Sequence, residues 1–98
     1  MVSDGCNIGQ AGTLESNDVM ITVAPGQKGS GVVIELTSIV MDQYGDAIRH
    51  TLAAVAAEEK ISDIMITAVD RGALDCTLRA RLLAALSRAG LMREREAV

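Results

Sequence analysis

The sequence has 98 residues, of which 49% are hydrophobic and 22% are charged, and this balance is typical of one globular domain. With one Tyr and neither Phe nor Trp, the core must be aliphatic, and so small a core leaves little room for a buried active site. The net charge of −4, the dispersed basic residues and the lack of a long apolar run argue against nucleic acid and membranes as partners.

The first predicted element is a β-hairpin. Residues 1–10 are mostly small and polar, and we expect them to form a flexible arm. Residues 11–16 are strand-like. In residues 19–24, Val19, Ile21 and Val23 share one face and the alternate residues share the other, as in a half-buried strand. Because Asn and Asp tolerate the left-handed backbone of tight turns, the intervening Ser16-Asn17-Asp18 predicts a hairpin with Ser16 at its exposed tip.

The rest of the chain alternates strand-like stretches with amphipathic helical ones, in which apolar residues recur three or four apart. In chain order we expect a strand over 32–37, a helix from Ser38 to about Lys60, a strand over 61–69 and a helix over 73–89. Ser38 is the expected N-cap of the first helix. Residues 91–98 form a charged tail that we expect to be flexible.

This element order, β-β-β-α-β-α, predicts the fold class. The helix between the third and fourth strands is long enough for a crossover, so these two strands should be parallel with a right-handed connection. The prediction is an α+β, two-layer sandwich, in which a four-stranded mixed sheet carries two helices on one face. We expect residues 1–98 to form this single domain.

Few residues offer chemistry of their own. His50 is the only histidine and has no partner at metal-ligand spacing, so we expect no metal site. Ser16, His50 and Asp70 could form a triad on paper, but the strained G-x-S-x-G turn of hydrolases is absent. Cys6 and Cys76 form no C-x-x-C motif, and the N-terminus has no secretory signal. We therefore expect a cytoplasmic protein with both thiols reduced.

Ser16 differs from the other candidates in its expected position. A hydroxyl at an exposed hairpin tip is held by rigid strands and is reachable by another protein. A modifying enzyme brings its own base and electrophile, so no local triad is needed. From the residues alone, a plain turn serine is the more frequent case.

Three segments resemble the acyl carrier protein family of citrate lyase, its gamma subunit. They are A-G-T-L-E-S-N-D-V-M-I at 11–21, Y-G-D-A-I-R at 44–49 and G-A-L-D-C-T-L-R-A-R-L at 72–82. They occur in the family's order and span most of residues 11–89. Asn17 stands where many members have Gly, and both residues accept turn geometry.

The resemblance implies that Ser16 carries 2′-(5″-phosphoribosyl)-3′-dephospho-CoA through a phosphodiester. It implies a non-catalytic carrier subunit that holds acetyl and citryl thioesters on this CoA-derived arm while citrate is cleaved to acetate and oxaloacetate. The implied partners are the citrate lyase alpha subunit, an acyl transferase, the beta subunit, a citryl lyase, and the transferase that attaches the prosthetic group.

Two alternatives remain open at this point. The carrier subunit of malonate decarboxylase uses a similar arm and is the nearest relative by function. A ligand-binding or assembly module would use the uncovered sheet face instead, around Met20, Thr22, Val33 and Glu35.

The acidic residues Glu15 and Asp18 flank Ser16. The implied arm carries phosphates, so we expect like charges to keep the arm off the surface of the carrier.

Overall fold

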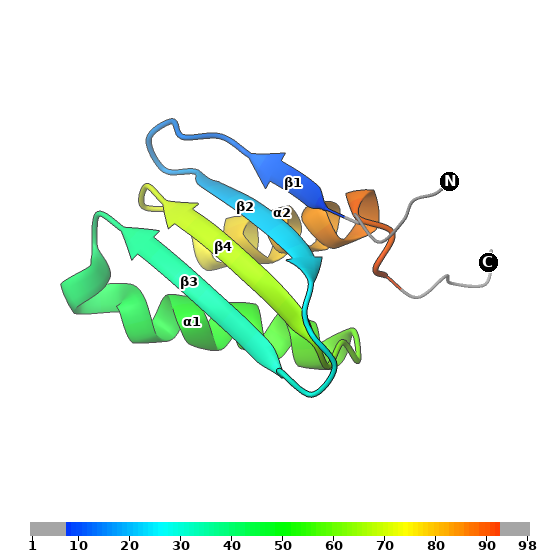
Figure 1. Cartoon of the computed structure of the whole chain (residues 1–98). Coiled ribbons are helices and arrows are strands. Elements are labelled where there is room, and N and C mark those ends of the chain that lie inside the picture. Colours follow the sequence, from blue (N-terminus) through cyan, green and yellow to red (C-terminus); the bar gives the residue numbers. More distant parts are fainter. Residues whose placement is uncertain (1–7, 93–98) are drawn as a thin grey trace.

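The computed structural model describes residues 8–92. In chain order its elements are β1 (Gly9–Gly12), β2 (Val19–Pro25), β3 (Val32–Ser38), α1 (Met41–Glu58), β4 (Ile64–Asp70) and α2 (Asp75–Arg88). The strands form one sheet in the order β1-β2-β4-β3, and both helices lie on the same face of it (Figure 1). β3 and β4 are parallel and the other pairs are antiparallel. The predicted α+β fold and element order are confirmed.

The core lies between the sheet and the two helices. Alternation along β2 puts Val19, Ile21 and Val23 inside, each fully buried. They meet alternate residues of β4 and the apolar stripes of both helices, among them Ile64, Ile66, Leu52, Val55, Leu82 and Leu86. Burying one such aliphatic side chain contributes roughly 1.5–3 kcal/mol, so these side chains hold the two layers together without any aromatic residue.

The first strand lies earlier than predicted. Gly9 and Gln10, which we expected in the flexible arm, belong to β1, and β1 ends at Gly12. β1 passes so close to α2 that a Cβ on Gly9 would collide with the backbone of Ala85 and Ala89. Glycine is therefore required at Gly9 by a contact with a distant helix. Residues 1–7 lie outside the described residues.

The first helix begins later than predicted. Ser38 is the last residue of β3, and Val40 occupies the N-cap position of α1. The Ser38 hydroxyl donates a hydrogen bond of 2.8 Å to Asp70 Oδ2 and accepts the backbone N–H of Val40 at 3.0 Å. Ser38 thus fastens the β3–α1 connection to the end of β4 instead of capping the helix.

The other predicted boundaries shift by a few residues. β4 begins at Ile64 rather than at residue 61, and α2 covers Asp75–Arg88 rather than 73–89. Leu91 and Met92, expected in the flexible tail, pack against the core, and the Leu91 N–H donates to the Leu86 carbonyl at 3.0 Å. Residues 93–98 lie outside the described residues.

Three connections meet at one end of the sheet, namely β1–β2, β3–α1 and β4–α2 (Figure 1). Parallel pairing of β3 with β4 brings the carboxyl ends of both strands to this end. The β1–β2 connection, which contains Ser16, turns beside them. The fold therefore places the Ser16 connection against the β4–α2 loop, and the β3–α1 connection against the end of β4 on the other side.

Candidate functional site

Ser16 lies at the second position of a β-turn over residues 15–18. The turn is closed by the Asp18 N–H, which donates to the Glu15 carbonyl at 3.2 Å. Asn17 adopts a φ of 65°, the left-handed conformation that the third position of a type II turn requires. Ser16 is exposed, and its hydroxyl has no hydrogen-bond partner among residues 8–92. The predicted exposed turn at Ser16 is therefore present.

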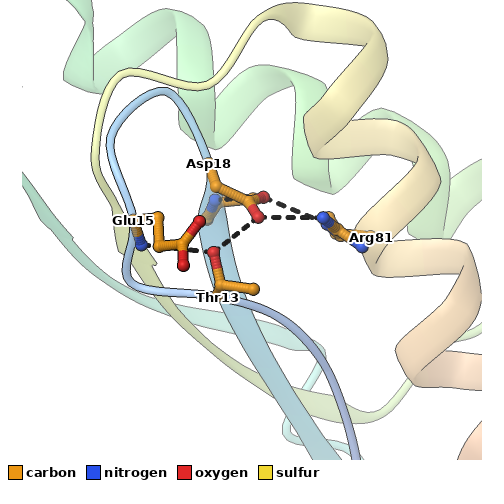
Figure 2. A network of polar contacts seen from close by, with 5 residues as sticks. Thr13, Glu15, Asp18 and Arg81 are labelled. Atoms are coloured by element: carbon orange, nitrogen blue, oxygen red, sulfur yellow. Dashed lines mark hydrogen bonds and ion pairs between the residues drawn. The ribbon is translucent and has the colours of Figure 1, made fainter.

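A polar network anchors this turn to α2 (Figure 2). The Asp18 carboxylate accepts two hydrogen bonds from the Arg81 guanidinium, at 3.0 Å from Nε and 2.8 Å from Nη2. It also accepts the Thr13 hydroxyl and the Val19 N–H, each at 2.7 Å. Thr13 in turn accepts the Glu15 N–H at 3.2 Å. A bidentate pair with these added bonds fixes the base of the turn, while Ser16 at its tip remains exposed.

The network also changes the charge beside Ser16. The hydrogen bonds from Arg81, followed by those from Thr13 and the Val19 backbone, hold the pKa of Asp18 well below its ordinary value of 3.8. Asp18 in return raises the pKa of Arg81. The negative charge of Asp18 is compensated, so the expected repulsion of an anionic arm is reduced to the part that Glu15 exerts.

The turn rests on the β4–α2 loop as well. The Asn17 N–H donates to the Arg71 carbonyl at 2.7 Å, and the Arg71 N–H donates to the Asp18 carbonyl at 2.8 Å. The Arg71 guanidinium reaches the Leu14 carbonyl at 2.9 Å through Nη1, while its Nε is buried without a partner. No local sequence pattern indicates this contact, because Arg71 and Leu14 are 57 residues apart.

The structure does not assemble Ser16, His50 and Asp70 into a catalytic triad. Asp70 is 1% exposed, and its carboxylate accepts the Ser38 hydroxyl and the N–H groups of Gly72 and Ala73 at 2.8–3.1 Å. His50 is exposed on α1. No hydrogen bond joins Ser16, His50 and Asp70 in the described part of the chain. Asp70 is therefore a structural residue that holds the loop beneath Ser16.

The other candidates give no second site. Within residues 8–92, no group of three or more His, Cys, Asp or Glu side chains is placed to hold a metal ion. Cys76 is exposed at the start of α2, and Cys6 lies outside the described residues. In the same part of the chain, neither helix combines the length and the apolar character needed to cross a membrane.

The Asp18–Arg81 pair makes a pH-dependent contribution to stability. Because the folded pKa of Asp18 is depressed, this contribution is fully present above the unfolded pKa of 3.8 and is lost as the pH falls toward the folded value. We expect Asp18→Asn to lower the urea midpoint at pH 7, and the difference in midpoint from wild type to narrow progressively as the pH falls below 3.8. Urea titrations from pH 7 to 2.5 measure this difference.

Arg81→Gln removes the main partner of Asp18 and serves as the companion variant. The difference in urea midpoint between wild type and Arg81→Gln should also narrow as the pH falls, because the lowered pKa of Asp18 depends first on Arg81. A difference in urea midpoint from wild type that stays constant with pH in both variants would contradict a stabilising role for the ionised Asp18–Arg81 pair.

Fold and site together define a small carrier-like module. It holds the Ser16 hydroxyl at a fixed, exposed position, and no side chain among residues 8–92 forms a hydrogen bond with that hydroxyl. Such a serine suits a group that is attached by one protein and presented to others.

Comparisons with known proteins agree with this class. A sequence model of the family described as "ACP: Malonate decarboxylase delta subunit (MdcD)" matches residues 7–89. The citrate lyase acyl carrier protein of Streptococcus equi subsp. equi is 48% identical over 82 residues, which cover 84% of this chain and 79% of that one. That of Edwardsiella ictaluri is 46% identical over 79 residues, with 81% and 80% covered. The chain therefore belongs to the citrate lyase acyl carrier protein family.

A solved structure shows the same fold. A chain of the Pseudomonas malonate decarboxylase hetero-tetramer in complex with malonate matches with a TM-score of 0.71, covering 88% of this chain and 87% of that chain. The identity is 21%, so this likeness concerns the fold alone.

Proposed function

We propose that the chain is the acyl carrier subunit of a citrate lyase and that Ser16 carries 2′-(5″-phosphoribosyl)-3′-dephospho-CoA through a phosphodiester. The observation behind this proposal is the exposed, unbonded Ser16 hydroxyl on an anchored turn, in a chain 48% identical to citrate lyase acyl carrier proteins. When bound, the arm supplies a thiol on which acetyl and citryl groups are held as thioesters, and this activates them for exchange and cleavage.

The contribution of the chain itself is positioning. The Asp18–Arg81 pair and the Asn17–Arg71 bond fix where the arm would begin. A tethered group reaches a partner's site at an effective concentration on the order of mM, without a separate binding step. We infer that the partners in the cytoplasm are the alpha and beta subunits of citrate lyase and the prosthetic-group transferase. The acyl chemistry then belongs to the partners, and the chain is not itself an enzyme.

A carrier role in malonate decarboxylase is the second candidate. It is favoured by the description of the matching family and by the shared fold. The identity of 46–48% to citrate lyase carriers from several genera favours citrate lyase. Adding the loaded chain to the alpha and beta subunits of citrate lyase, or to the remaining subunits of malonate decarboxylase, separates the two candidates, because only the matching set should turn over.

Intact mass tests the attachment site. We expect the chain, produced together with its modifying enzymes, to gain one mass increment that peptide mapping places on Ser16 and that Ser16→Ala abolishes. Ser87→Ala is the matched control, because Ser87 is also exposed and lies near the far end of α2. An active complex whose Ser16 is unmodified would contradict the proposal.

A further inference from the structure

A groove of ≈ 380 Å³ lies between α1 and the start of α2. Its walls are mainly apolar, with Tyr44 and Ala47 on α1 facing Leu74 and Leu78. Tyr44 and Leu74 are large hydrophobic residues that are nonetheless 54% and 69% exposed. Polar atoms lie here too, because the Thr51 hydroxyl donates to Asp75 Oδ1 at 2.6 Å. The volume is that of a small-molecule pocket, which is typically about 300–1,000 Å³.

This groove is continuous with the turn that carries Ser16. Gly72 lines the groove, and a Cβ on Gly72 would lie 3.5 Å from Asn17 Oδ1. The preceding residue, Arg71, accepts the Asn17 N–H through its carbonyl. A group attached to Ser16 therefore has to cross only the Arg71–Gly72 segment to enter the groove.

Charge favours an anion at the start of that path. The Arg71 guanidinium bonds the Leu14 carbonyl, two residues before Ser16, and has a buried, unpaired Nε. Within residues 8–92 no carboxylate forms an ion pair with Arg71, whereas Arg81 is neutralised by Asp18. A guanidinium without a carboxylate partner is complementary to a phosphodiester.

We propose that the arm on Ser16 folds back onto its own carrier between transfers, with its phosphate beside Arg71 and its less polar, thiol-bearing part in the groove between α1 and α2. This inference rests on the proposed loading of Ser16. The tether supplies an effective concentration on the order of mM, so an intrinsic affinity in the same range keeps the groove about half occupied. Such weak binding shields the thiol and still lets a partner withdraw the arm.

Attachment of the arm to Ser16 should change the NMR and fluorescence signals of residues that line the groove. We expect amide chemical shifts of Ala47, Thr51 and Leu74 to differ between apo and loaded chain, in addition to those of the turn. Tyr44 is the only aromatic residue, so its emission reports the groove directly. Changes confined to residues 13–18 would overturn the inference.

The rate of alkylation of the arm thiol measures how far the groove shields that thiol. The chain's own thiols are first removed by Cys6→Ser and Cys76→Ser. Ala47→Phe fills the groove and should speed alkylation roughly two- to fivefold, as expected when a half- to mostly-bound arm is released. Ala53→Phe is the matched control, because Ala53 is also exposed on α1 but does not line the groove. Equal rates in both variants and in the parent chain would overturn the inference.

A second pair of variants, one test and one control, examines the role of Arg71. Arg71→Gln should reduce the chemical-shift changes that loading causes in the groove residues. Arg88→Gln is the control and should leave these changes intact. Arg88 is a matched choice because it too donates to a backbone carbonyl, that of Gln10, at 2.8 Å. If the Ala47→Phe chain kept the parent alkylation rate but bound its partner subunits less tightly, the groove would belong to a partner. Absence of any mass increment on Ser16 would reject the proposed function as well, so the two failures are distinguishable.

Discussion

A complex assembled with the Ser16→Ala chain is expected to cleave citrate no faster than a mixture lacking the chain. Under the proposed function, every acyl group passes through the arm on Ser16. The comparison is made at fixed concentrations of the partner subunits. Oxaloacetate release is the measured quantity.

The loss must be chemical and not structural. The Ser16 side chain is exposed and has no hydrogen-bond partner among residues 8–92, so its replacement should change the free energy of unfolding by no more than about 0.5 kcal/mol. Ser16→Ala should therefore bind the partner subunits as well as Ser87→Ala does. Full activity of the Ser16→Ala complex would remove the basis of the proposed function.

Much of the fold could be predicted because its signals are local. Val19, Ile21 and Val23 alternate with less buried residues, and this period identifies β2 and its inner face without any tertiary information. The crossover rule then made β3 and β4 parallel, as the structure has them. The turn at Ser16 was predictable too, because Asn17 is one of the few residues that accept a φ of 65°.

The errors in the fold have tertiary causes. Gly9 shows no strand pattern, and its place in β1 follows from its pairing with Val23 of β2 and its close contact with α2. Serine is a residue type favoured at helix N-caps, but the Ser38 hydroxyl donates a hydrogen bond to Asp70 of the neighbouring strand. In both cases a residue distant in the sequence outweighs a local preference.

The surroundings of Ser16 could not be predicted for the same reason. Asp18 and Arg81 are 63 residues apart, and no spacing rule joins them. The bond from Arg71 to the Leu14 carbonyl spans 57 residues. The sequence indicated an exposed turn at Ser16, whereas the charges beside that turn are brought there only when α2 and the β4–α2 loop fold against the hairpin.

Asp70→Ala is expected to lower the free energy of unfolding by about 2–4 kcal/mol, because it leaves several polar groups without their acceptor. The Asp70 carboxylate, 1% exposed, accepts the Ser38 hydroxyl and the N–H groups of Gly72 and Ala73. It thereby ties the end of β3 to the loop that leads into α2. Urea unfolding at pH 7 gives the magnitude.

The same variant tests whether the loop supports the Ser16 turn. The Asn17 N–H bonds the carbonyl of Arg71, the residue after Asp70, so loosening the loop should speed hydrogen exchange at the Asn17 amide. Asp46→Ala, which removes an exposed aspartate of α1, is the control and should change stability by no more than about 0.5 kcal/mol. If Asp70→Ala lost as little stability as Asp46→Ala and left Asn17 exchange unchanged, Asp70 would not hold this end of the molecule together, and the position of Ser16 would depend on the Asp18–Arg81 pair and the backbone bonds to Arg71 without help from Asp70.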